Sequence, residues 1–136
     1  MKILLDTDIL VDVALDRRPF SEPASALLDK LEQKPGTGFI AWHSASNLFY
    51  LVSSVSQSKD ALQFIRELLG FIEIAHVGTP DMVFALSLEM PDFEDALQSA
   101  AAVACKAEWI VTRNLRHYKN SPVRAISPGD LLLKHI

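Results

Sequence analysis

The chain has 136 residues, the size of one domain, which excludes two full domains side by side. Hydrophobic residues make up 49% and charged residues 22% of the chain, which is a globular composition and not a disordered one. Its 13 Lys and Arg residues against 17 Asp and Glu give a net charge of -4, so bulk charge alone cannot hold a nucleic acid. If this protein acts on a polyanion, it needs metal ions or a local basic patch.

The first half of the chain predicts strands and helices in turn. Short apolar runs indicate buried strands, and apolar residues at helical spacing indicate amphipathic helices. Ser21 and Ser58 are expected to cap helices, and Pro19, Gly36 and Gly70 to end elements. In chain order we expect a strand at 2–5, helices at 8–15 and 21–34, a strand at 37–42, a helix opened by Ser44 and Ser46, and a helix at 58–69.

The second half continues this alternation. Thr79-Pro80-Asp81 is typical of a helix start, and Ser127 is expected to cap the last helix. In chain order we expect a strand at 71–77, helices at 79–90 and 92–107, strands at 109–112 and 124–126, and a final helix after 127. Alternating strands and helices predict one α/β domain over 1–136 with a mainly parallel sheet.

The redox state and the location follow from what the sequence lacks. Cys105 is the only cysteine, so no internal disulfide forms, and we interpret it as a buried structural thiol. The apolar run at the start stops at Asp6, too early for a signal peptide. No stretch reaches the ~18–20 apolar residues of a membrane span. We therefore expect a cytoplasmic protein without a membrane partner.

Acidic and polar residues gather where strands end or helices begin. Sites in open α/β sheets form at the carboxyl ends of strands. The segments there are Asp6-Thr7-Asp8, Asp92-Phe93-Glu94-Asp95 and Thr112-Arg113-Asn114. Asp92 and Asp95 share one helical face, and the alternative interpretation is that Asp92 is just an N-cap and Asp95 just a first-turn acid. Converging carboxylates repel each other, and oxygen ligands suit Mg²⁺ or Mn²⁺, so we predict a divalent-metal site.

Three motifs together resemble the PIN-domain family. They are LLDTDILVD at the start, DFEDALQSAAAVACKAEWIVTRN in the second half, and the tail RHYKNSPVRAISPGDLL. The resemblance implies a three-layer α/β/α fold and an Mg²⁺- or Mn²⁺-dependent endoribonuclease. It also implies a VapC-type toxin that forms a homodimer and pairs with a small antitoxin. By position, Asp6 and Asp95 match catalytic and metal-binding acids, with Asp92 as a frequent companion.

Two positions depart from the family pattern. Asn47 stands where the family usually has a glutamate, and Asn114 stands where a fourth acid is common. The acid sometimes found three residues later is His117 here, and Asp8 replaces the usual asparagine. Amide oxygens can still bind water or metal, but neutral ligands should weaken metal affinity.

Supporting residues can be proposed around these acids. Thr7 and Thr112 could hold the carboxylates or bind phosphate, with local capping an equal alternative for Thr7. Asp12 is expected to play at most a supporting part, and His117 is the one histidine expected near the site. The basic residues Arg113, Arg116, Lys119 and Arg124 could steer RNA phosphates or form an ordinary solvated loop. Phe39, Phe49 and Tyr50 are interpreted as core residues, and Trp42, at a strand end, as the best exception.

Two alternatives to the ribonuclease stay open. DTDIL also resembles the nucleophile loop of haloacid-dehalogenase-type phosphatases, with Asp6 as nucleophile and Asp8 as general acid. The other alternative is a catalytically weakened PIN domain that only binds RNA or a partner. An antitoxin would need an apolar groove near the second and fourth helices, which the sequence cannot locate.

Overall fold

The computed structural model describes residues 1–136 as five short parallel strands, seven α-helices and one 3₁₀ turn. The sheet has the order β3-β2-β1-β4-β5 and all of its strand pairs are parallel. The strands are β1 (Ile3–Leu5), β2 (Gly38–Ile40), β3 (Glu73–Ile74), β4 (Trp109–Val111) and β5 (Ala125–Ile126). The helices are α1 (Thr7–Ala14), α2 (Ser21–Glu32), α3 (Trp42–Ser53), α4 (Ser58–Leu68), α5 (Thr79–Ser87), α6 (Phe93–Ala104), η1 (Leu115–Tyr118) and α7 (Pro128–Lys134).

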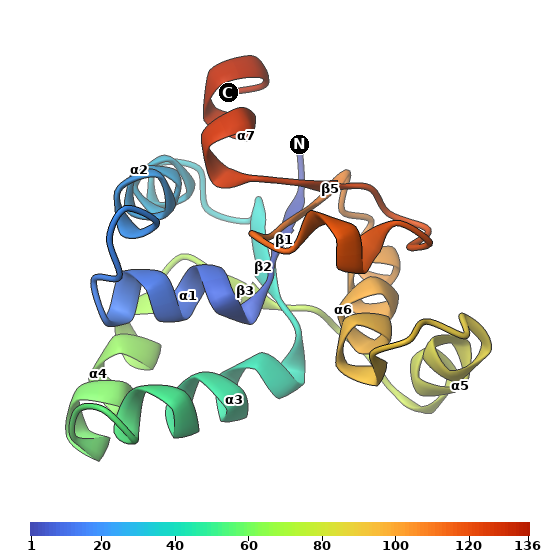
Figure 1. The fold of residues 1–136 in the computed structure, drawn as a ribbon, viewed down its shortest axis with the longest axis horizontal. Helices are drawn as coiled ribbons and strands as arrows, with labels where there is room; N and C mark the ends of the chain where they lie inside the picture. The colour runs from blue at the N-terminus through green and yellow to red at the C-terminus, as the bar shows by residue number, and fades with distance from the viewer.

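The helices cover both faces of the sheet, as Figure 1 shows, so the three-layer α/β/α fold is confirmed. Alternate strand residues enter different layers because side chains point to opposite faces of a strand. Ile3 and Leu5 join the core beneath α1 to α4 and α7, whereas Leu4 joins the core beneath α5 and α6. The strands are buried on both faces, which explains why they read as continuous apolar runs.

The alanine-rich helix α6 packs directly on the sheet. Ala96, Ala100, Ala101 and Ala102 are at most 3% exposed and belong to the core that also holds Leu4 and Ile110. Small side chains let the helix lie close to the strands, as the sequence indicated. Cys105 ends this helix as a buried free thiol, and burial raises the pKa of that thiol.

Several element boundaries differ from the sequence prediction. The expected strand at 71–77 shrinks to Glu73–Ile74, and α3 begins at Trp42 instead of Ser44, so Trp42 opens a helix and does not end a strand. Ser21 and Ser58 are not N-caps: each is the first residue of its helix, and the Ser21 hydroxyl donates to Asp16 Oδ1 at 2.7 Å. Ser127 does cap α7 by accepting from the Asp130 N–H at 3.2 Å.

The elements after β4 bring an unpredicted 3₁₀ turn, η1, beside the strand ends. It places Tyr118 in the core next to α6 with 3% exposure. No helix combines the length with the apolar character that crossing a bilayer requires.

Because all strand pairs are parallel, the carboxyl ends of β1, β2 and β4 lie side by side, with β1 in the centre.

Gly38 is expected to be intolerant of even one added methyl group. A Cβ at this buried position in β2 would lie 2.5 Å from Ile72 Cδ1 and 3.0 Å from Leu31 Cδ1, both on packed side chains. We expect Gly38→Ala to lower the free energy of unfolding by ~1–3 kcal/mol through overpacking, measured by urea denaturation. Gly129→Ala, where nothing lies within 4 Å of the new Cβ, serves as the control and should leave stability unchanged or slightly raised. Equal losses in the two variants would contradict this account.

Candidate active site at the carboxyl ends of the strands

Asp6 is the centre of the candidate site. It follows β1, is 8% exposed, and its Oδ1 accepts from the Thr7 N–H at 2.7 Å, which caps α1. Its Oδ2 accepts from the Thr112 hydroxyl at 2.8 Å and the Tyr118 hydroxyl at 3.0 Å. A buried carboxylate is costly unless hydrogen bonds satisfy it, and here donors from α1, the segment after β4, and η1 do so. Thr112 therefore holds a carboxylate, which is one of the two roles predicted for it.

Asp92 and Asp95 lie at the start of α6, near Asp6. Asp92 Oδ1 accepts from the N–H groups of Glu94 at 2.8 Å and Asp95 at 3.3 Å, so Asp92 is the N-cap of α6. Asp95 Oδ1 accepts from the Tyr118 hydroxyl at 3.3 Å. Burial, and then the charges of Asp92 and Asp6, raise the pKa of Asp95 to about 6. Asp95 therefore lies close enough to Asp92 and Asp6 to be affected by both charges.

Tyr118 joins the two central acids and was missed in the sequence analysis. Its hydroxyl lies 3.0 Å from Asp6 Oδ2 and 3.3 Å from Asp95 Oδ1. Burial and the two neighbouring carboxylates raise the Tyr118 pKa, so the phenol stays protonated. A phenol has one proton and can donate to only one carboxylate at a time. Asp6 and Asp95 therefore share a single donor.

Asp8 lies on the β4 side of Asp6. Its Oδ2 accepts from the side-chain amide of Asn114 at 3.0 Å and from the backbone N–H of Arg113 at 3.2 Å. Its Oδ1 is buried without a hydrogen-bond partner. Burial and the charge of Asp6 raise the pKa of Asp8 to about 6. Asn114 therefore orients an acid through its amide.

Arg113 does not take the predicted role of a free phosphate-steering cation. Its Nε and Nη2 donate to the two oxygens of Asp12 at 2.6 and 3.1 Å, and its guanidinium lies 4.0 Å from the centre of the Phe20 ring. Arg17 Nε also donates to Asp12, at 2.9 Å. Asp12 has no exposed surface, and both guanidinium groups share its single carboxylate. This residue was expected to play at most a supporting part, yet it fixes the loop after β4.

The Thr7 hydroxyl contacts no carboxylate, so this part of its prediction was wrong. It donates to Ser44 Oγ at 3.1 Å, and Gln98 Nε2 donates to Ser44 Oγ at 2.9 Å. All three residues are at most 5% exposed, so this network joins α1, α3 and α6 beneath the acids. Only the backbone N–H of Thr7 contacts Asp6. Local sequence patterns could not predict this network, because its members lie far apart along the chain.

Asn47 and two histidines complete the site. The Asn47 amide donates to the Glu94 carboxylate, so the position of the expected glutamate faces an acid from α6. His117 Nδ1 lies 3.2 Å from Asp95 Oδ2, within ion-pair distance but without a well-directed hydrogen bond. His43, which was not expected near the site, feels the charges of Glu94 and Asp6, although burial dominates and lowers its pKa. Tyr50 is 68% exposed and lines the acidic cavity, so its interpretation as a core residue was wrong.

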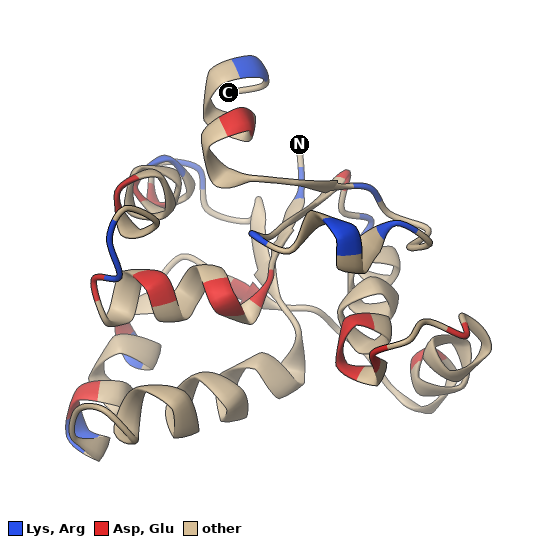
Figure 2. Cartoon of the chain, viewed as in Figure 1, with Lys and Arg blue, Asp and Glu red and all other residues tan.

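These residues enclose an acidic cavity of about 450 Å³, lined among others by Asp6, Asp8, Asn47, Asp92, Asp95, Asn114 and His117. Figure 2 shows acidic segments at the starts of α1 and α6 and basic segments in the chain after β4. As placed, no three His, Cys, Asp or Glu side chains are close enough to hold a metal ion. The chemistry nevertheless fits a hard cation, because Asp8 Oδ1 and Asp95 Oδ2 are buried without hydrogen bonds and both carboxyls resist ionisation.

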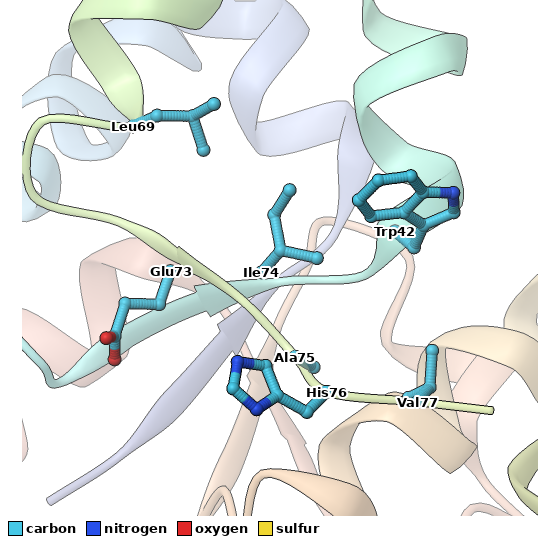
Figure 3. Close-up of a pocket in the computed structure, with 7 residues that line it drawn as sticks. All are labelled: Trp42, Leu69, Glu73, Ile74, Ala75, His76 and Val77. Atoms are coloured by element: carbon cyan, nitrogen blue, oxygen red, sulfur yellow. The ribbon is translucent and has the colours of Figure 1, made fainter.

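A larger cavity of about 910 Å³ lies at the outer edge of the sheet, beside β3. Figure 3 shows Ile74 pointing toward Trp42, whereas Glu73 and His76 point the other way. Trp42 is 70% exposed, which confirms it as the exception among the predicted core aromatics. Only two titratable side chains line this cavity, and no carboxylates converge there. The chemistry therefore lies in the smaller, acidic cavity.

The two raised pKa values predict how stability depends on pH in the absence of divalent ions. Asp8 and Asp95 bind protons more tightly in the folded state than in the unfolded state, so stability falls as the pH rises from about 4 through about 6. We expect Asp8→Asn to raise the free energy of unfolding at pH 7.5 by ~2 kcal/mol, with about half of that gain at pH 5. Urea denaturation in EDTA at both pH values measures this. The exposed Asp130→Asn is the control, and a pH-independent effect of Asp8→Asn would contradict the assignment.

Comparisons with known proteins agree with this architecture. A family model described as PIN domain matches residues 2–116. The fold is similar to VapBC2 from Rickettsia felis bound to a promoter DNA fragment, with a TM-score of 0.74 and 20% identity over 93% of this chain and 98% of that one. It is also similar to VapC20 from Mycobacterium tuberculosis, a toxin that cleaves the sarcin–ricin loop, with a TM-score of 0.66 and 15% identity over 80% of this chain and 87% of that one.

A toxin–antitoxin complex from Klebsiella pneumoniae gives a TM-score of 0.68 and 23% identity over 93% of this chain and 98% of that one. No curated protein sequence matches the chain significantly. At these identities the solved structures establish the fold alone, and they agree with the observed parallel sheet between two helical layers. Since the family model spans most of the sequence and includes both acidic motifs, the chain belongs to the PIN-domain family.

Proposed function

We propose that this protein is a metal-dependent endoribonuclease that hydrolyses RNA phosphodiesters. The observation that carries the proposal is the pair of carboxylates, Asp6 and Asp95, that share the Tyr118 hydroxyl at the strand ends. Both line the acidic cavity, where unpartnered acid oxygens favour a divalent cation. The structural similarity to VapC20, a toxin that cleaves the sarcin–ricin loop, supports RNA as the substrate class.

In this proposal Asp6, Asp95 and Asp92 hold Mg²⁺ or Mn²⁺. When bound, the ion activates a water and stabilises the charge that develops during displacement at the phosphorus. Asp6 keeps a fixed orientation through Thr7, Thr112 and Tyr118. Asp92 caps α6 through Oδ1 alone, so Oδ2 is available to a ligand. The neutral Tyr118 hydroxyl orients both central acids without adding charge.

The alternatives now carry unequal weight. Membership of the PIN-domain family removes the basis for the phosphatase interpretation of DTDIL. A weakened PIN domain that only binds RNA remains the competing proposal, because Asn47 and Asn114 replace expected acids. Against it, these amides donate hydrogen bonds to Glu94 and Asp8, so each organises an acid at the cavity. The cytoplasmic location and the homodimer stay predictions.

Neutral variants of the central acids test the metal mechanism. We expect Asp6→Asn and Asp95→Asn to abolish Mn²⁺-dependent cleavage of RNA, by at least ~100-fold, without unfolding, because the acids repel each other when no metal is bound. Calorimetric titration with Mn²⁺ should show weakened binding in the same variants. Asp130→Asn on α7 is the matched control and should keep both properties. Wild-type cleavage that survives in EDTA would refute the metal mechanism.

We further propose a small antitoxin as partner, bound in a groove between α2 and α4. This groove of about 220 Å³ has an apolar floor that includes Leu28, Phe64 and Phe71. Its rim carries the acids Asp29, Glu32 and Glu67. An amphipathic segment with basic residues beside its apolar face would fit both features. Similarity to toxin–antitoxin complexes supports a partner of this kind.

Charge reversal at the rim of the groove tests this partner. The probe is the small DNA-binding protein that we expect the adjacent reading frame to encode. It should inhibit RNA cleavage by the wild type, and Glu32→Lys combined with Glu67→Lys should weaken inhibition at least ~10-fold by repelling basic residues. Glu22→Lys combined with Glu108→Lys carries the same charge change at other exposed positions and should be inhibited like the wild type. Equal inhibition of both double variants would contradict the groove.

A further inference from the structure

Few of the basic residues near the acidic cavity are free to meet a phosphate. Arg17, which lines the acidic cavity, and Arg113 are both paired with the single carboxylate of Asp12. Arg18 lies 3.6 Å from Asp16, and the Arg124 guanidinium lies 3.7 Å from the centre of the Trp109 ring. Two basic residues remain in the segment after β4, Arg116 and Lys119. Both are exposed and neither forms an ion pair.

Arg116 and Lys119 line a second cavity of about 430 Å³ together with Met90, Pro91 and Asn120. Asp92, Asp95 and His117 form a wall common to this cavity and the acidic cavity. The two free cations therefore lie directly beyond the acids, on the η1 side. When one RNA phosphate lies at the acids, the next phosphate along the strand would contact Arg116 and Lys119. The positive charge of these two residues would offset the repulsion of that phosphate by Asp92 and Asp95.

The opposite rim of the acidic cavity offers an aromatic ring. Tyr50 of α3 lines this cavity and is 68% exposed. The Phe49 ring meets it edge-on, with centroids 5.3 Å apart and planes at 72°, which restricts the orientation of the Tyr50 ring. Helix α3 contains no Asp, Glu, Lys or Arg, as its uniform colour in Figure 2 shows. The phosphates beside a base on Tyr50 therefore meet no carboxylate of this helix.

We propose that single-stranded RNA crosses the site from η1 to α3, with a phosphate on Arg116 and Lys119 and an unstacked base against Tyr50. The substrate class rests on the proposed function, whereas the path rests on the free cations and the exposed ring. A duplex keeps its bases stacked and withholds them from Tyr50, so the arrangement selects single strands or loops.

Fluorescence anisotropy with a labelled short single-stranded RNA in EDTA tests the path without cleavage. Arg116→Gln with Lys119→Gln should weaken binding and reduce the slope of log affinity against log salt by about 1.4, from ~0.7 per phosphate contact. Lys30→Gln with Lys34→Gln changes net charge equally at the other end of the strands and should leave the slope unchanged. Tyr50→Leu should weaken binding about five-fold or more at an unchanged slope, while Tyr50→Phe keeps the ring and the affinity.

The outcomes separate this path from the proposed nuclease activity. Equal losses in the two charge pairs, wild-type affinity for the complementary duplex as high as for the single strand, or no measurable RNA binding would each overturn the path. Binding with the expected pattern, but no Mn²⁺-dependent cleavage, would support the path and refute the nuclease. Cleavage by the wild type with none of the expected binding changes would support the nuclease and refute the path.

Discussion

The burial of one carboxylate, Asp6 at the end of β1, is the constraint on which the rest of the site depends. A buried carboxylate at the end of the central strand is tolerated only with several hydrogen-bond donors. The Thr7 N–H, the Thr112 hydroxyl and the Tyr118 hydroxyl provide them. These donors belong to α1, the segment after β4, and η1, so satisfying one acid fixes three elements relative to β1. The same hydrogen bonds bring Asp95 beside Asp6 through Tyr118.

The sequence predicted the parts of this arrangement that follow from local pattern. A carboxylate after an apolar run marks Asp6, and spacing of three on a helix start marks Asp92 and Asp95. The alternation of elements gave the layers. Tyr118 and Asp12 could not be found this way, because their roles depend on which distant segments meet: Tyr118 lies 112 residues from Asp6, and Arg113 lies 101 residues from Asp12. Element ends also escaped prediction where tertiary contacts, and not caps, decide them, as at Ser21 and Trp42.

The buried Asp12 cluster changes how the basic residues of this chain should be interpreted. Counting cations along 113–124 suggests a basic patch, but two of the guanidinium groups near the site bind a fully buried acid. Removing Asp12 would leave both unpaired, so the cluster is a structural element that anchors the loop after β4. Asp8 receives the Arg113 backbone N–H from that loop. The cluster therefore acts on the site by fixing the backbone of this loop, and Asp12 offsets part of the positive charge of Arg17 and Arg113.

The asparagines at 47 and 114 then have a coherent physical role. Each donates a hydrogen bond to an acid, Glu94 or Asp8, instead of adding another negative charge to the cavity. With Asp6, Asp8, Asp92, Glu94 and Asp95 already lining it, further carboxylates would raise the repulsion that already elevates the pKa of Asp8 and Asp95. Amide donors lower that repulsion while keeping the acids in place. The acids that line the cavity therefore come from the starts of α1 and α6. They keep the cavity strongly acidic although Asn47 and Asn114 stand where the family often has acids.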